Sequence, residues 1–94
     1  MTFNLRKKFV YYFPAQYCSE ENVSLFTDMN LEYNHIDKLP ETFDNFSSLQ
    51  IINLGHNNLI KLPYSLCKLH NIEAIGLHNN NILYLPDEIC NWKK

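Results

Sequence analysis

The stretch Leu49–Asn71, LQIINLGHNNLIKLPYSLCKLHN, contains the pattern that decides the fold. Moved forward by 23 residues, it aligns with IEAIGLHNNNILYLPDEICNWKK at 72–94. Moved back by the same distance, it aligns with FTDMNLEYNHIDKLPETFDNFSS at 26–48. Several apolar positions, an asparagine and a Leu-Pro pair coincide in all three copies. A period of this length is typical of domains that stack repeated units side by side.

Each copy combines two periodicities. In the central copy, Ile52 and Leu54 alternate with outward positions, which predicts a short strand, and Asn57 is suited to the turn that follows. After Leu62-Pro63 the apolar residues are spaced three or four apart, as in a helical segment. Proline can open such a segment because the first N–H has no intrahelical partner. Stacked copies are therefore expected to form a parallel sheet on one face and helical or 3₁₀ turns on the other.

The first 25 residues align with the repeat when Phe13-Pro14 is placed on Leu39-Pro40. Val10, Leu5 and Phe3 then occupy core positions, while Lys8 replaces the asparagine. The segment between Cys18 and Phe26 is three residues longer than its counterparts, which indicates an insertion on the outer side. We predict one domain over residues 1–94, made of a degenerate first repeat and three regular ones: 1–25, 26–48, 49–71 and 72–94.

The full pattern, LxxLxLxxNxLxxLPxxIxxLxx, resembles that of leucine-rich repeats. The LPxxI segment and the repeat length are similar to those of the intracellular, Ras-binding-scaffold-like subclass. This resemblance implies an α/β leucine-rich-repeat solenoid, with a short parallel β-sheet on the concave face and short helical or 3₁₀ turns on the convex face. It also implies an asparagine ladder, Asn34, Asn57 and Asn80, whose side chains bond the backbone of adjacent coils. For function, it implies a protein–protein interaction module, and possible roles are those of a scaffold or adaptor in signal transduction.

Candidate binding residues lie at the outward-facing positions of the strands and of the turns that follow them. Because neighbouring strands lie about 4.8 Å apart, equivalent residues of successive repeats form columns and the columns form one patch. Tyr33 is an aromatic anchor of the type enriched at binding hot spots, beside two histidines. A mixed, merely soluble surface is the alternative. The predicted partner-binding residues of the concave face are Asp28, Asn30, Glu32, Tyr33, Ile51, Asn53, His56 and His78.

Composition and charge exclude several classes of protein. The net charge of −2 gives no basic footprint for nucleic acid. No apolar run approaches the ~20 residues of a membrane span. The apolar run after Arg6-Lys7-Lys8 is cut by Pro14 and is too short for a signal peptide. We therefore expect neither a nucleic acid nor a membrane as partner.

The three cysteines are few and odd in number, which favours a reducing compartment and a cytoplasmic location. Cys67 and Cys90 fall at equivalent positions of stacked repeats and could approach one another. We prefer to interpret them as small residues packed behind the helical turns.

Catalysis has little support. His56 and His78, with Glu32 or Asp28 nearby, could be imagined as a metal site, but nothing in the sequence requires a metal. No Ser/His/Asp set or glycine-rich phosphate loop is present, and the chain has only two glycines. We expect no enzymatic activity, no cofactor and no metal.

The last repeat suggests a second interpretation of the protein. No polar cap follows it, so its apolar edge (Ile75, Leu77, Ile82, Leu85) is expected to be partly exposed. Such an edge favours self-association through the C-terminal coil, or belongs to a piece of a longer array. The alternative function is therefore that of a structural or truncated repeat array.

Overall fold

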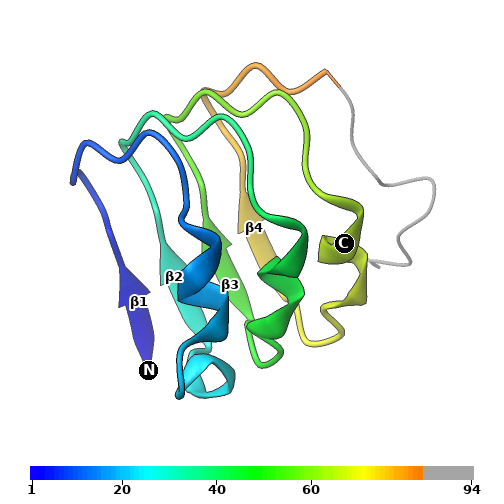
Figure 1. Ribbon diagram of the computed structural model, residues 1–94. Coiled ribbons are helices and arrows are strands. Elements are labelled where there is room, and N and C mark those ends of the chain that lie inside the picture. The colour runs from blue at the N-terminus through cyan, green and yellow to red at the C-terminus, as the bar shows by residue number, and fades with distance from the viewer. Residues whose placement is uncertain (84–94) are drawn as a thin grey trace.

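Four short parallel strands form one sheet in chain order (Figure 1). The computed structural model describes residues 1–83 of the chain. The strands are β1 (Thr2–Asn4), β2 (Asp28–Asn30), β3 (Ile51–Asn53) and β4 (Ala74–Gly76). Their register pairs Thr2 with Asp28, Asp28 with Ile51 and Ile51 with Ala74, as the repeat alignment predicts.

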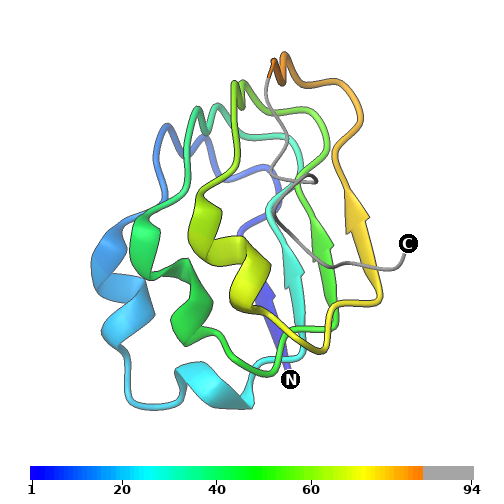
Figure 2. The ribbon, with the colours of Figure 1, turned by 90° about the vertical axis from the view of Figure 1, so that its right-hand side faces the viewer.

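Short 3₁₀ helices cover one face of the sheet (Figure 2). They are η1 (Ala15–Ser19), η3 (Glu41–Asn45) and η4 (Tyr64–Lys68), each preceded by a proline. The carbonyl oxygens of Pro40 and Pro63 accept the N–H of the residue three positions on, at 3.1 Å in both cases. We call each strand, with the turn and the 3₁₀ helix that follow it, a coil, and we call the uncovered side of the sheet the open face.

The core lies between the sheet and the 3₁₀ helices. In coils 2 and 3 the inward-facing side chains of the strands and of the residue after each strand are almost completely buried, namely Met29, Leu31, Ile52 and Leu54. Phe43, Phe46, Leu66 and Leu69 close the core from the helical side. Burying one such side chain stabilises the fold by roughly 1.5–3 kcal/mol, and each is covered by its neighbouring coil.

The three ladder asparagines link each coil to the one before it. Asn57 is buried; its Oδ1 accepts the N–H of Ile36 at 3.0 Å, and its Nδ2 donates to the carbonyls of Leu31, Leu54 and Gly55 at 2.9–3.2 Å. Asn34 and Asn80 make equivalent bonds to their own neighbours. An amide serves here because it combines a donor with an acceptor, which Lys8 at the same place in coil 1 does not.

Coil 1 differs from the others in its core and in its connection to β2. The added residues after Cys18 include a further 3₁₀ turn, η2 (Val23–Leu25). Inside the coil, the ring of Phe3 packs against those of Phe13, Tyr17, Phe26 and Phe46 with centroids 5.3–5.6 Å apart. Aromatic rings thus fill this part of the core, whereas the buried apolar side chains of coil 3 are aliphatic.

The cysteines have different environments. Cys18 is buried and free, and its burial raises the pKa of its thiol. Cys67 is disulfide-bonded, which corrects the preferred interpretation of this residue as a packed thiol. Cys90 lies outside the described residues. The disulfide counts against the predicted reducing compartment, since disulfides persist mainly in oxidising ones.

No helix within residues 1–83 is long and apolar enough to cross a bilayer.

Candidate functional site

Each strand is followed, three residues after its end, by a residue in the left-handed backbone conformation. These residues form one column: Lys7, Tyr33, His56 and Asn79, with φ between 57° and 60°. The sharp turn sends the next residue inward, which is how Asn34 and Asn57 reach the core. For a residue other than glycine, this conformation costs roughly 1–2 kcal/mol, and asparagine tolerates it better than most.

The rings of Tyr33 and His56 stack at this place in neighbouring coils. Their centroids lie 4.1 Å apart and their planes differ by 8°. Tyr33 is 42% exposed, and the Arg6 guanidinium and the Lys7 ammonium lie 5.1 Å and 5.2 Å from the centroid of its ring. The edge of His78 faces His56 at 5.1 Å. The open face therefore carries a continuous aromatic and cationic strip across all four coils.

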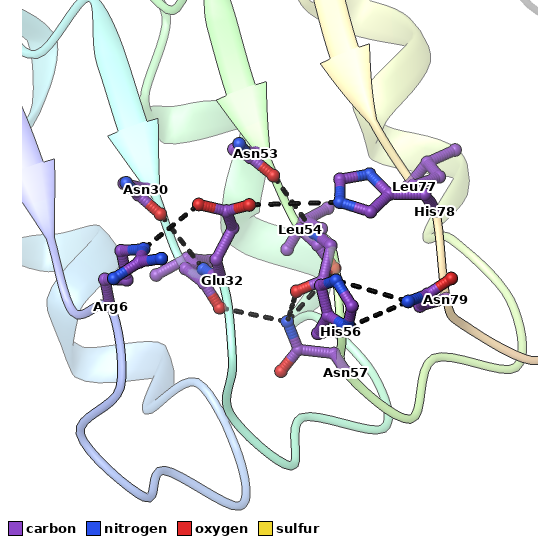
Figure 3. A network of polar contacts seen from close by, with 12 residues as sticks. Arg6, Asn30, Glu32, Asn53, Leu54, His56, Asn57, Leu77, His78 and Asn79 are labelled. Atoms are coloured by element: carbon purple, nitrogen blue, oxygen red, sulfur yellow. Dashed lines mark hydrogen bonds and ion pairs between the residues drawn. The ribbon is translucent and has the colours of Figure 1, made fainter.

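Glu32 connects the two ends of this strip (Figure 3). One of its carboxylate oxygens accepts the Nε–H of Arg6 at 3.2 Å, and the other lies 3.9 Å from Nε2 of His78. The Glu32 side chain is only 17% exposed. These contacts fix the direction of the carboxylate, so it is positioned before any partner arrives.

Gly55 makes the approach of His78 possible. It occupies the position of coil 3 between Glu32 and His78, and a Cβ there would clash with the His78 imidazole. Its φ is not positive, so the glycine is needed for space and not for backbone freedom. The missing side chain lets His78 lie across coil 3 toward coil 2.

In the described part of the chain, Asn30 and Asn53 use the oxygen of their side-chain amide, but not the nitrogen, to stabilise the fold. Their Oδ1 atoms each accept the backbone N–H two residues on, from Glu32 and Gly55, at 3.1 Å. Asn4 does the same for Arg6 at 2.9 Å. These bonds end the strands, since asparagine commonly satisfies the backbone two positions ahead in turns. Neither Nδ2 bonds another described residue, so the donors of Asn30 and Asn53 remain open to a partner.

The structure brings most of the predicted binding residues together, but not all. Asn30, Glu32, Tyr33, Asn53, His56 and His78 lie at or just beyond the carboxyl ends of the strands. Asp28 and Ile51 are a neighbouring pair at the other strand ends. There Asp28 accepts the Thr27 hydroxyl at 2.9 Å and Ile51 is exposed. The candidate site is therefore centred on Tyr33, His56 and Glu32, with Asp28 and Ile51 at its border.

Sequence reasoning omitted three residues of this strip from its candidate set. Arg6 and Lys7 flank the Tyr33 ring, and Asn79 donates from Nδ2 to Nδ1 of His56 at 2.9 Å. All three fall in the same alignment columns as the chosen residues. The repeat alignment therefore indicated these three residues, but an alignment column does not show which side chains are in contact.

The geometry suits recognition by hydrogen bonding and aromatic contact. Within residues 1–83, no group of three or more His, Cys, Asp or Glu side chains is arranged to hold a metal ion. The two histidines instead contact Tyr33, Glu32 and Asn79.

Comparison with known proteins agrees with the fold. Residues 24–82 match the family model of the leucine-rich repeat. The chain belongs to the leucine-rich repeat family, whose domains generally mediate protein–protein interactions. A comparison with curated proteins finds no significant match.

Proposed function

We propose that this protein is a protein-binding module that holds its partner on the open face of the sheet. The observation that carries the proposal is the stacked pair Tyr33–His56, in which Tyr33 is exposed and His56 is partly exposed although both residues have a left-handed backbone. Neither ring fills the core. Asn79 shows that the chain uses a small polar residue at the same place in coil 4.

The cost of that conformation supports a role in binding. Strained backbone is retained at functional sites when the surroundings hold it in place. Here the ladder asparagine that follows each residue holds the turn, so a smaller side chain at 33 or 56 would serve the fold equally well. A tyrosine beside an arginine is also the composition enriched at binding hot spots.

In this mechanism the partner meets a preformed surface. The Arg6–Glu32–His78 contacts fix the charged groups, and the stack fixes the aromatic anchor, so little side-chain entropy is lost on binding. The free Nδ2 donors of Asn30 and Asn53 then select carbonyl or carboxylate oxygens of the partner. Specificity arises because a partner without acceptors there leaves these donors unpaired.

Affinity capture from a lysate of the native source tests this proposal. The bait variant is Tyr33→Asn/His56→Asn, which uses the residue that the chain itself has at Asn79. The matched control is Tyr64→Asn, because Tyr64 is an exposed tyrosine on η4, away from the open face. We expect a protein captured by wild type and by the control but lost with the double variant. Capture that is the same with all three baits would contradict a binding role for the stack.

The finer assignment follows from the same features. We propose that the coils form a curved solenoid of the 23-residue LPxxI subclass, with the open face as its concave side and a non-catalytic adaptor or scaffold role. Supporting it are the Leu-Pro pairs before η3 and η4 and the parallel sheet with one strand per coil. A cytoplasmic location stays a prediction, and the Cys67 disulfide counts against it.

Self-association through coil 4 is a second candidate, favoured by one observation. Ile75, Leu77 and Ile82 are only partly buried, whereas the equivalent Ile52, Leu54 and Leu59 are fully buried. A second copy of the chain placed against this edge would cover them. Leu85, the fourth residue of the predicted edge, lies outside the described residues.

A further inference from the structure

The segments that follow the four strands line up along one edge of the molecule, at the top of Figure 1. They are residues 5–13, 31–39, 54–62 and 77–83, and we call this edge the ridge. Backbone hydrogen bonds join its members from coil to coil: His35 to Val10 at 2.7 Å, Asn58 to Ile36 at 2.9 Å and Leu83 to Ile60 at 2.8 Å. The ridge is therefore an ordered surface rather than a set of independent loops.

Charge is strongly segregated between the ridge and the rest of the molecule. The basic residues on the ridge are Arg6, Lys7, Lys8, Lys38 and Lys61, and its acidic residues are Glu32 and Asp37. Elsewhere in residues 1–83 the only basic residue is Lys68, against the acidic residues Glu20, Glu21, Asp28, Glu41, Asp44 and Glu73. Since Glu32 is paired with Arg6, the ridge is positive although the whole chain has a net charge of −2.

Large apolar side chains project from the same edge. The exposed fraction is 78% for Phe9, 67% for Tyr11, 65% for Tyr12, 48% for Ile60 and 72% for Leu83. Phe9 also has a left-handed backbone, with φ 59°, although its exposed side chain does not pack in the core. Tyr11, Ile60 and Leu83 occupy one column of the repeat alignment, where coil 2 has Asp37. The ridge therefore combines exposed apolar side chains with lysines.

We propose that the ridge attaches the protein to an anionic lipid surface. Lys8, Lys38 and Lys61 supply the charge that draws a protein to acidic headgroups. Phe9, Tyr11, Tyr12, Ile60 and Leu83 supply side chains that partition into the headgroup and acyl boundary. Their arrangement favours a bilayer over a protein partner. The apolar side chains project separately from the edge, and a fluid bilayer can accommodate each of them, whereas a protein would need a matching pocket for each.

This attachment differs from the functions already described. It involves contact with the surface of a membrane and not a span through it. The ridge borders the open face but does not use Tyr33, His56 or Glu32 for contact, so a protein partner could bind at the same time. It also departs from the sequence expectation that no membrane is involved.

Co-sedimentation with vesicles tests the proposal on the full chain. The probes are vesicles of phosphatidylcholine alone and vesicles with about one-third phosphatidylserine, at low and at physiological salt. We expect binding to the anionic vesicles only, weakened by salt. Lys8→Gln/Lys38→Gln/Lys61→Gln should weaken that binding by about 100-fold, at about five-fold for each lysine.

The helix η4 provides matched controls for both kinds of contact. Lys68→Gln removes an exposed lysine away from the ridge, and Tyr64→Ser removes an exposed aromatic ring away from it. Each should leave binding within about two-fold of wild type, because a charge beyond a Debye length of the surface contributes little. Phe9→Ser/Leu83→Ser should weaken it at least ten-fold, while circular dichroism shows an unchanged fold.

Insertion of the apolar side chains into the bilayer can be measured separately by fluorescence. Tyr12→Trp should show a blue shift of tryptophan emission with anionic vesicles, and Tyr64→Trp should not. Failure of the wild-type chain to bind anionic vesicles at low salt would overturn the proposal. So would loss of binding with the lysine variant but not with the apolar variant, which would identify the ridge as a site for soluble polyanions or acidic proteins.

Discussion

At the scale of single residues, the asparagines that hold the coils together are distinct from those that face a partner. Asn57 lies inside and satisfies backbone groups of two coils, whereas Asn53 lies outside and satisfies only its own turn. In the sequence both are asparagines, four residues apart. The alignment separates them by column, but only the hydrogen bonds show that Asn53 has also a structural function.

Asn57→Ala should be the most destabilising change at any ladder position. It leaves the N–H of Ile36 and the carbonyl of Leu31 buried without these bonds, at about 1–3 kcal/mol for each unsatisfied group. We expect a loss of about 3 kcal/mol in the free energy of unfolding, measured by urea denaturation.

The neighbouring Asn58 is the control for this change, because it is exposed and takes part in no side-chain hydrogen bond among the described residues. Asn58→Ala should change the free energy of unfolding by less than about 0.5 kcal/mol. Equal effects of the two substitutions would show that the Asn57 side chain does not link the coils.

Gly55 illustrates what the sequence could not show at this scale. In the repeat alignment, a glycine at an outward-facing position indicates only a small residue. Gly55 matters because the His78 ring, which contacts Glu32, occupies the space that a side chain at position 55 would fill. A contact between side chains of coils 2 and 4 across coil 3 has no signature in a pattern that compares equivalent positions.

At the scale of elements, strands and helical turns could both be predicted because each has its own apolar period. The strands are only three residues long, and the alternation Met29–Leu31 or Ile52–Leu54 was enough to place them. The type of helix was left open. Five residues separate each proline from the second core position after it, Phe46 or Leu69, and in the structure they form tight i→i+3 bonds, so the described turns are 3₁₀.

Cys18, on η1, makes the stability of coil 1 dependent on pH. Burial raises the pKa of its thiol in the folded chain, so the unfolded chain loses the proton first as pH rises. The folded state then holds more protons, and stability falls with pH from about 8.5, the ordinary thiol pKa, upward. Below that pH both states keep the proton and Cys18 adds no pH dependence.

Urea denaturation of wild type and Cys18→Ala between pH 7 and pH 10 measures this effect. The variant should show a smaller fall in the free energy of unfolding across that range, because groups other than Cys18 contribute equally to both proteins. Short incubations are needed, since a thiolate in the unfolded chain can attack the disulfide at Cys67. Parallel pH profiles would show that the thiol is not buried in coil 1.

At the scale of the whole molecule, the repeat predicted the order of the strands but not the distribution of charge. A net charge of −2 suggested an unremarkable surface. Because each coil returns its strand-to-helix segment to the same edge, lysines far apart in the sequence gather there while acidic residues gather elsewhere. Likewise the run at Phe9–Phe13 was assigned to the degenerate first repeat and judged too short for a signal peptide. The exposure of Phe9, Tyr11 and Tyr12 on the ridge became visible only once coil 1 was folded.

The half-buried edge of coil 4 makes oligomeric state a property to measure on the whole chain. If Ile75, Leu77 and Ile82 pair two copies, light scattering should show a dimer that dissociates on dilution through the micromolar range. Ile75→Lys should then give a monomer at every concentration. A monomer for the wild-type chain at high concentration would dispose of this candidate.

The account rests most heavily on the Tyr33–His56 stack as the anchor for a protein partner. Its most direct test is the dissociation constant for the partner captured by the wild-type chain, measured by titration calorimetry with Tyr33→Asn and with Tyr64→Asn. A hot spot contributes at least about 2 kcal/mol, so Tyr33→Asn should weaken binding about 30-fold while Tyr64→Asn leaves it unchanged. Equal dissociation constants for Tyr33→Asn and wild type, with the fold intact, would contradict the central claim.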